Sequence, residues 1–201
     1  MRNELLRILV TSLLGGLGLG MLVAASVFWS SRLAKGPTAS QARERPRIRS
    51  EADAAPLRAR ALVLPVDGIT VEALRDSFGD PRDGHLHEAL DIMAPRGTRV
   101  VAVDDGKVHK LHSSARGGLT VYQLDQSESY CFQYAHLDRY ASGLREGDVL
   151  RKGSLVGYVG TTGNAPRDVP HLHFGILRLT PARVSWQGEP VNPFRVWVPS
   201  R

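Results

Sequence analysis

The chain has 201 residues, of which 42% are hydrophobic and 23% are charged, so its composition excludes a wholly disordered, collagen-like or all-membrane protein. This length accommodates one domain of ordinary size and an appendage, but not two full domains beside a membrane segment. The single cysteine, Cys131, excludes an intramolecular disulfide and the structural zinc sites that need two or more thiolates.

The net charge of +6 is concentrated in one segment near the amino terminus. Residues 30–60 carry eight Lys or Arg against three acidic residues, whereas residues 61–201 carry sixteen of each sign. A surface that binds nucleic acid needs a basic patch on the folded domain. We therefore expect no nucleic-acid partner.

The first predicted element is a membrane anchor. Residues 8–29 contain no charge, and 22 residues of helix are about 33 Å long, enough to cross a hydrocarbon layer of about 30 Å. We expect a transmembrane signal anchor over this range, with residues 1–7 as a short cytoplasmic tail. A cleaved signal peptide is the alternative, although its apolar region is usually only about 7 to 15 residues long. Basic residues follow the segment as well as precede it, so charge alone does not orient it.

The rest of the chain divides into a linker and a domain. Residues 30–60 lack apolar periodicity and contain scattered Pro and Arg, which predicts a basic flexible linker. Residues 61–201 contain short apolar runs bounded by Gly and Asp, which predict a mainly β domain of antiparallel strands. We expect strands over residues 99–103, 119–124, 129–134, 155–159 and 171–177, and short helices over residues 71–75 and 137–142.

Two groups of histidines and carboxylates have the spacing of a metal site. His171 and His173 lie two apart in a strand-like run, so they share a face about 6.5 Å apart and can converge on one site. His87 precedes Asp91 by four residues, about 13 Å along a straight strand, so the backbone must turn if both bind one metal. Two histidines and one carboxylate with an open fourth position make a catalytic zinc site. His136 is a further candidate for proton transfer.

Other polar residues have simpler interpretations. His85 precedes His87 by two and competes with it as a ligand, but the four-residue spacing to Asp91 favours His87 and makes His85 a rim residue. The remaining expectations are that His109 and His112 lie on the surface, that Glu88 is a solvated carboxylate, and that Cys131 is a core residue.

An ordered set of short motifs across residues 62–197 resembles the M23 peptidoglycan endopeptidases, the zinc metallopeptidases of the lysostaphin and LytM type. In chain order the motifs are Ser77-Phe78-Gly79-Asp80-Pro81-Arg82, His87-xxx-Asp91, Ala94-Pro95-Arg96-Gly97-Thr98, Tyr134-Ala135-His136-Leu137, Gly147-Asp148-Val149-Leu150, Gly160-Thr161-Thr162-Gly163-Asn164, Pro170-His171-Leu172-His173-Phe174 and Val191-Asn192-Pro193. The resemblance implies an antiparallel sheet that floors a peptide-binding groove. It also implies one zinc ion per chain, with His87, Asp91 and His173 as ligands and His136 and His171 as catalytic residues.

The activity implied by this resemblance is hydrolysis of peptide cross-links in peptidoglycan. That substrate lies outside the cytoplasmic membrane, which implies a single-pass inner-membrane protein with its catalytic domain on the periplasmic side. The alternative is a catalytically silent regulator or scaffold of other cell-wall hydrolases, but all five functional positions are filled here. The family usually has glycine where this chain has Ala89, so we expect backbone strain there if that position needs a positive φ.

Overall fold

The computed structural model describes residues 51–82, 84–179 and 188–200, and the described part is mainly antiparallel β-sheet. Its strands are β1 (Pro81–Arg82), β2 (His85–Leu86), β3 (Leu90–Met93), β4 (Arg99–Val101), β5 (Gly106–Ser114), β6 (Gly118–Asp125), β7 (Tyr130–Tyr140), β8 (Val149–Leu150), β9 (Leu155–Val159), β10 (His171–Leu179) and β11 (Gly188–Val191). The helical segments are residues 51–58, the 3-10 turn η1 (Val71–Ala73) and α2 (Phe194–Trp197). The predicted β class is therefore confirmed.

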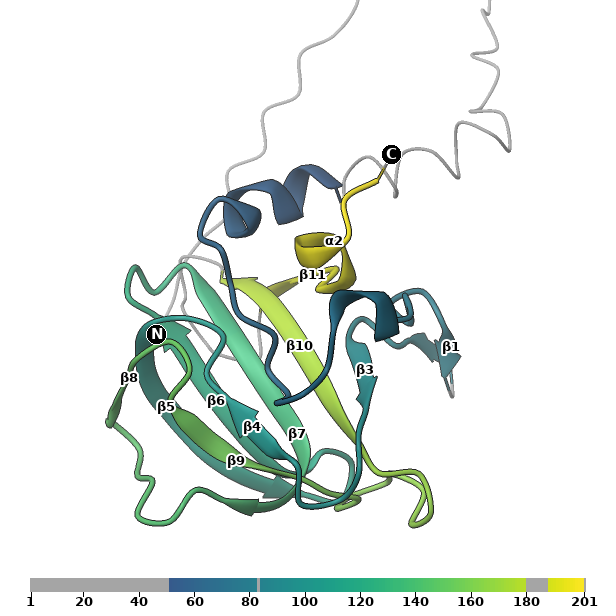
Figure 1. Cartoon of the computed structure of the whole chain (residues 1–201), viewed down its shortest axis with the longest axis vertical. Helices are drawn as coiled ribbons and strands as arrows, with labels where there is room; N and C mark the ends of the chain where they lie inside the picture. The colour runs from purple at the N-terminus through teal and green to yellow at the C-terminus, as the bar shows by residue number, and fades with distance from the viewer. Residues whose placement is uncertain (1–50, 83, 180–187, 201) are drawn as a thin grey trace, which may run out of the picture. The chain divides into compact units, whose positions relative to one another are not determined.

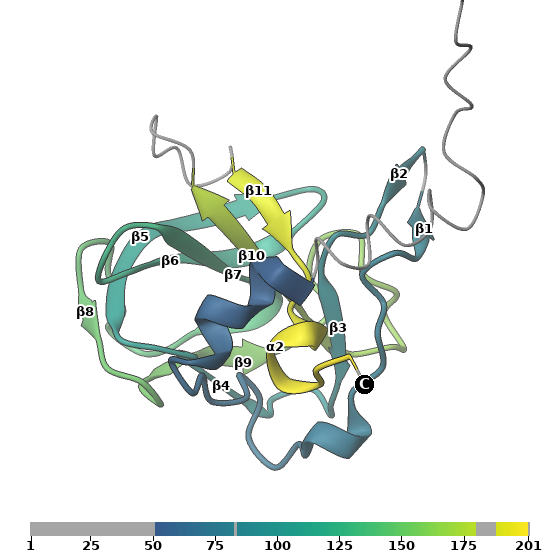
Figure 2. The same ribbon diagram turned by 90° about the horizontal axis from the view of Figure 1, so that it is seen from above.

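One large sheet organises the described residues. Its main path runs β11-β10-β7-β6-β5-β8, and β3 adds to β10 while β9 joins β7 to β4. Figure 1 shows β5, β6, β7 and β10 side by side as a curved surface. β1 and β2 form a separate hairpin that projects beyond β3 (Figures 1 and 2).

The core lies on one face of this sheet, beneath the helical segments. The aromatic rings of Phe132, Tyr134 and Phe174 are fully buried. The ring centroid of Trp197 in α2 lies 5.9 Å from that of Phe174. The helix over residues 51–58 lies beside α2 (Figure 2). Burial of these rings stabilises the face of the sheet opposite the polar residues described below.

The structure corrects three expectations about local structure. Residues 51–58 fall within the predicted linker but form a helix that buries Ala54 and Leu57, so the folded part begins before residue 61. Residues 137–142 were expected to be helical, but β7 continues to Tyr140 because buried Leu137 pairs with strands on both sides. β5 was not predicted, since its nine residues are mostly half-buried and show no clean alternation.

The predicted transmembrane segment, residues 8–29, and residues 30–50 of the predicted linker lie outside the described residues. Among the helices that are described, none has the length and apolar composition needed to span a bilayer.

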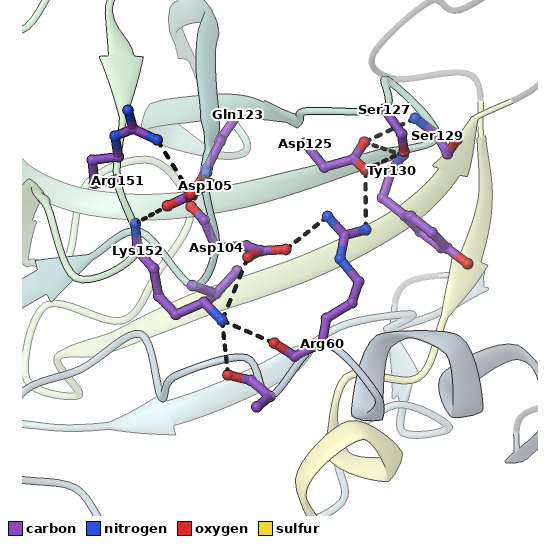
Figure 3. A network of polar contacts seen from close by, with 12 residues as sticks. Arg60, Asp104, Asp105, Gln123, Asp125, Ser127, Ser129, Tyr130, Arg151 and Lys152 are labelled. Atoms are coloured by element: carbon purple, nitrogen blue, oxygen red, sulfur yellow. Dashed lines mark hydrogen bonds and ion pairs between the residues drawn. The ribbon is translucent and has the colours of Figure 1, made fainter.

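Polar contacts attach the turn after the first helical segment to the sheet (Figure 3). The guanidinium of Arg60 pairs with Asp125 at 3.0 Å and with Asp104 at 2.7 Å. Asp125 also accepts the backbone N–H groups of Ser129 and Tyr130, each at 2.8 Å, so its buried carboxylate closes the β6–β7 turn. Burial alone would raise the pKa of Asp125, but hydrogen bonds from the Ser127 hydroxyl and the Tyr130 N–H, together with Arg60, hold it below its usual value.

Candidate functional site

The backbone between His87 and Asp91 turns back on itself, as their spacing required. The N–H of His87 donates to the carbonyl of Asp80 at 2.9 Å, and the N–H of Glu88 donates to the carbonyl of Phe78 at 2.9 Å. Glu88 has a left-handed φ of 54°, whereas the φ of Ala89 is not positive. The strain expected at Ala89 is therefore absent, and the preceding residue makes the turn.

Strand pairing brings the second histidine group to the same place. In the β3–β10 pairing Asp91 lies directly opposite His173, and His171 lies opposite Met93. Both histidines line one cavity, as their spacing of two predicted.

The side chains of His87, Asp91 and His173 converge. Nε2 of His87 lies 2.9 Å from Oδ1 of Asp91 and 3.0 Å from Nδ1 of His173, which lies 3.3 Å from the same Oδ1. In the described part of the chain, these three residues form the group whose donor atoms, all within 4.8 Å of one another, could hold a metal ion.

The donor atoms suit a zinc ion. Nδ1 of His87 lies 3.0 Å from the carbonyl of Ser77, which can only accept, so Nδ1 carries the proton and Nε2 presents a lone pair. Oδ1 of Asp91 is buried, and no donor reaches it with hydrogen-bond geometry. Burial would raise the pKa of Asp91, but His173 and His87 hold it well below its usual value, so the group is a carboxylate. Two imidazoles and a buried carboxylate oxygen without a donor fit Zn²⁺.

His136 reaches the cavity through an unusual backbone conformation. In a regular strand Ala135 and His136 would point to opposite faces, yet both line the cavity. His136 has a φ of 60°, and its N–H donates to the carbonyl of Gly117 at 2.8 Å, outside the regular ladder of β7. This left-handed residue turns the imidazole toward the groove.

Hydrogen bonds orient the two histidines outside the metal group. Nδ1 of His136 donates to the carbonyl of Thr162 at 2.8 Å, and Nδ1 of His171 donates to that of Val169 at 2.8 Å. Their ring centroids lie 5.1 Å apart, and Nε2 of His171 is 3.8 Å from Oδ1 of Asp91.

The environment of His136 keeps it neutral. Burial lowers the pKa of its imidazole to about 4; the carbonyl of Thr162 opposes this shift, and His173 and His171 add to it. Burial likewise lowers the pKa of His173, although the neighbouring Asp91 raises it. At pH 7 His136 is therefore a neutral imidazole with its proton on Nδ1 and a lone pair on Nε2.

The cavity is a groove of about 530 Å³ floored by polar residues of the sheet. The groove is lined by Thr120 and Tyr122 on β6 and by Gln133 on β7. Val121, which lies between the two β6 residues, points to the other face of the sheet and is buried in the core. Sequence reasoning missed these floor residues, although the alternation of Thr120 and Tyr122 with buried Val121 is a usable signal.

The remaining histidines and acidic residues lie at different distances from the centre. His112 is half-buried and lines the groove, where its ring centroid lies 6.4 Å from that of Tyr122. His85 is exposed at the rim, where it accepts from the guanidinium of Arg116, and Glu88 is exposed beside it. His109 is half-buried and Cys131 is fully buried in the core.

Comparisons with known proteins give a consistent result. Residues 85–193 match the model of Peptidase family M23. An L-Ala--D-Glu endopeptidase from Bacillus subtilis is 30% identical over 145 residues, which cover 68% of this chain and 43% of that protein. The murein hydrolase activator NlpD from Salmonella typhimurium is 28% identical over 137 residues, 68% of this chain and 31% of that protein. The chain thus spans less than half the length of either relative.

A solved structure has the same fold. The catalytic domain of the prophage-encoded M23 protein EnpA from Enterococcus faecalis superposes with a TM-score of 0.51 at 26% identity, covering 67% of this chain and 95% of that one. The match therefore extends over nearly the whole of an isolated catalytic domain.

Proposed function

The chain belongs to Peptidase family M23, and from that premise we propose that it is a zinc metalloendopeptidase that hydrolyses the peptide cross-links of peptidoglycan. The observation that carries this proposal is the convergence of His87, Asp91 and His173 around a buried carboxylate oxygen that no donor reaches. Such an oxygen is costly unless a cation satisfies it. A relative named as an L-Ala--D-Glu endopeptidase supports peptide hydrolysis, and one named as a peptidoglycan DD-endopeptidase supports the substrate class.

In this proposal three side chains hold the metal and two handle protons. Nε2 of His87, Oδ1 of Asp91 and Nδ1 of His173 would bind one zinc ion per chain. A bound zinc ion supplies a Lewis acid that activates water near neutral pH and polarises the scissile carbonyl.

His136 and His171 would act beside the metal. Since Nδ1 of each ring is engaged with a backbone carbonyl, Nε2 is the atom that takes up a proton. The ring of His136 is neutral at pH 7, so Nε2 presents a lone pair that can accept a proton from the attacking water. The resulting imidazolium can then donate that proton to the leaving amine or to the oxyanion.

A second candidate function is activation of another wall hydrolase, because one relative is named as a murein hydrolase activator. A protein that only binds and activates would not need an oriented group of four histidines and a carboxylate. Here each of these five side chains lines the groove, which favours the enzyme.

We also propose that residues 8–29 anchor the chain in the inner membrane by a single pass, with the catalytic domain on the periplasmic side. The uncharged stretch is long enough to span, and peptidoglycan lies outside that membrane. Alkaline phosphatase fused after residue 201 should be active and remain in the membrane fraction. Phosphatase activity released in soluble form would support the cleaved signal peptide instead.

The test of the activity uses the full chain purified in detergent. Digestion of purified peptidoglycan should release muropeptides whose masses identify the broken bond, a chelator should abolish their release, and added Zn²⁺ should restore it. A zinc-loaded chain that releases nothing but accelerates a second purified wall hydrolase would establish the activator function in place of the enzyme.

A further inference from the structure

The two oxygens of the Asp91 carboxylate have different partners. Oδ1 faces the imidazoles of His87 and His173, whereas Oδ2 accepts a hydrogen bond of 2.7 Å from the guanidinium of Arg82. Arg82 reaches Asp91 from β1, a strand of the projecting hairpin, rather than from the sheet that carries the carboxylate. Arg82 ends the first motif of the family resemblance, but the expectations from the sequence gave it no role at the metal group.

We propose that Arg82 is a positioning residue that restricts Asp91 to binding the metal through Oδ1 alone. The inference rests on the proposed function, because it assumes that a metal binds at this group. A carboxylate can offer a metal one oxygen or both. With Oδ2 held by the guanidinium, a single oxygen remains, and a position stays open for the water that the proposed reaction consumes.

The solvent exposure of the Arg82–Asp91 pair and the attachment of its hairpin favour a positioning role over a contribution to stability. The Arg82 side chain is 44% exposed and that of Asp91 18%, and ion pairs this open to solvent contribute little to stability. Two hydrogen bonds, from the N–H groups of His87 and Glu88 to residues just before β1, fix the hairpin against the start of the metal group. The guanidinium is thus presented to Oδ2 by the same turn that presents His87.

Charge and position make opposite predictions for the zinc affinity. A guanidinium next to a cation site repels the cation, so if its charge were all that mattered, Arg82→Gln would bind zinc more tightly. If Arg82 positions Asp91, the same substitution frees Oδ2 and weakens zinc binding. Removal of such an outer partner of a metal ligand typically costs about 10- to 100-fold in affinity.

The experiment measures zinc dissociation constants of the full chain by competition with a chromophoric chelator. We expect Arg82→Gln to raise the dissociation constant about 10- to 100-fold and Arg82→Lys, which keeps the charge but not the planar fork, to have an intermediate effect. In the Co²⁺-loaded chain, the visible bands of Arg82→Gln should weaken as the second oxygen binds and the coordination number rises. The matched control is Arg75→Gln, which removes a similar pair, Arg75 to Asp80 at 2.8 Å, without touching the metal group.

The outcomes separate the inference from the proposed function. A wild-type dissociation constant and cobalt spectrum in Arg82→Gln, or tighter binding, would overturn the inference while leaving the zinc site intact. A wild-type chain that binds no zinc would overturn the proposed function and the inference together. Thermal unfolding of each variant checks that it is folded, and Arg82→Lys serves as the test if Arg82→Gln is not.

Discussion

In His87, His136 and His171, a backbone carbonyl bonded to Nδ1 leaves Nε2 as the nitrogen available to the site. The carbonyl of Ser77 engages Nδ1 of His87, and the hydroxyl of Ser77 accepts the N–H of Asp91 at 3.0 Å. One buried serine thus orients two of the three metal-binding residues. The sequence contained a signal for it, because Ser77 begins the first motif of the family resemblance, but its contacts depend on a turn that spacing alone does not specify.

Because some of the histidines would bind zinc and others would transfer protons, their substitution should affect zinc binding and turnover differently. His87→Ala or His173→Ala should abolish both zinc binding and hydrolysis, because two donors do not hold the ion tightly. His171→Ala should keep most of its zinc while kcat falls about 10²- to 10⁴-fold, since it removes only a proton-handling group. Metal content by mass spectrometry and release of muropeptides measure the two effects.

The control for these substitutions is His85→Ala at the groove rim, which should retain zinc. Full zinc stoichiometry in His87→Ala or His173→Ala would refute the ligand assignment. An unchanged rate in His171→Ala would remove that residue from the mechanism.

At the scale of elements, the β5–β6 turn and the loop after β9 approach so closely that only glycine fits at their contact. A Cβ built on Gly163 would lie 2.3 Å from the backbone N of Gly118, and Gly163 has a φ of +77°. The neighbouring Thr162 carbonyl is the partner of His136. The contact between two loops therefore fixes the orientation of a proposed catalytic residue.

Gly163→Ala should displace this loop. We expect a loss of stability above the roughly 1 kcal/mol that a left-handed alanine alone costs, and a lower kcat with zinc retained. The matched control is Gly153→Ala, where φ is +84° but no atom lies within 4 Å of the built Cβ, so only the backbone strain applies. Thermal unfolding and kcat check the comparison, and equal effects of the two substitutions would contradict the packing argument.

At the scale of the whole molecule, the buried Asp125 makes stability depend on pH. Its pKa is lower in the folded chain than in the unfolded one, so its contribution is present above about pH 4, the unfolded value, and is lost as the pH falls through the folded value. Asp125→Asn should cost about 1–3 kcal/mol at neutral pH, because the substitution breaks the pair with Arg60. Urea unfolding of both chains should show this difference narrowing as the pH is lowered from about 6 to about 3. A difference independent of pH would contradict the assignment.

The sequence allowed the β class to be predicted, and the spacing of His171 and His173 reflects strand geometry directly, whereas the full set of metal and catalytic residues followed from the family resemblance. It did not allow the course of β7 to be predicted past His136, where a left-handed residue interrupts the alternation and Leu137 resumes it in the core. The helix over residues 51–58 was missed because only Ala54 and Leu57 of a charged stretch are fully buried. Ser77 and Arg82 begin and end the first motif of the family resemblance, but their tertiary contacts could not be predicted from that motif.

The separation of the metal-binding residues along the chain has a kinetic consequence. His87 and His173 are 86 positions apart and become neighbours only when β3 pairs with β10. Closing so long a loop is entropically costly, so we expect the ion's site to be assembled late in folding. Added Zn²⁺ should then leave the refolding rate nearly unchanged and slow unfolding, which stopped-flow tryptophan fluorescence can measure. A refolding rate that rises with zinc would contradict this order of events; otherwise the ion prolongs the lifetime of the folded chain without guiding its formation.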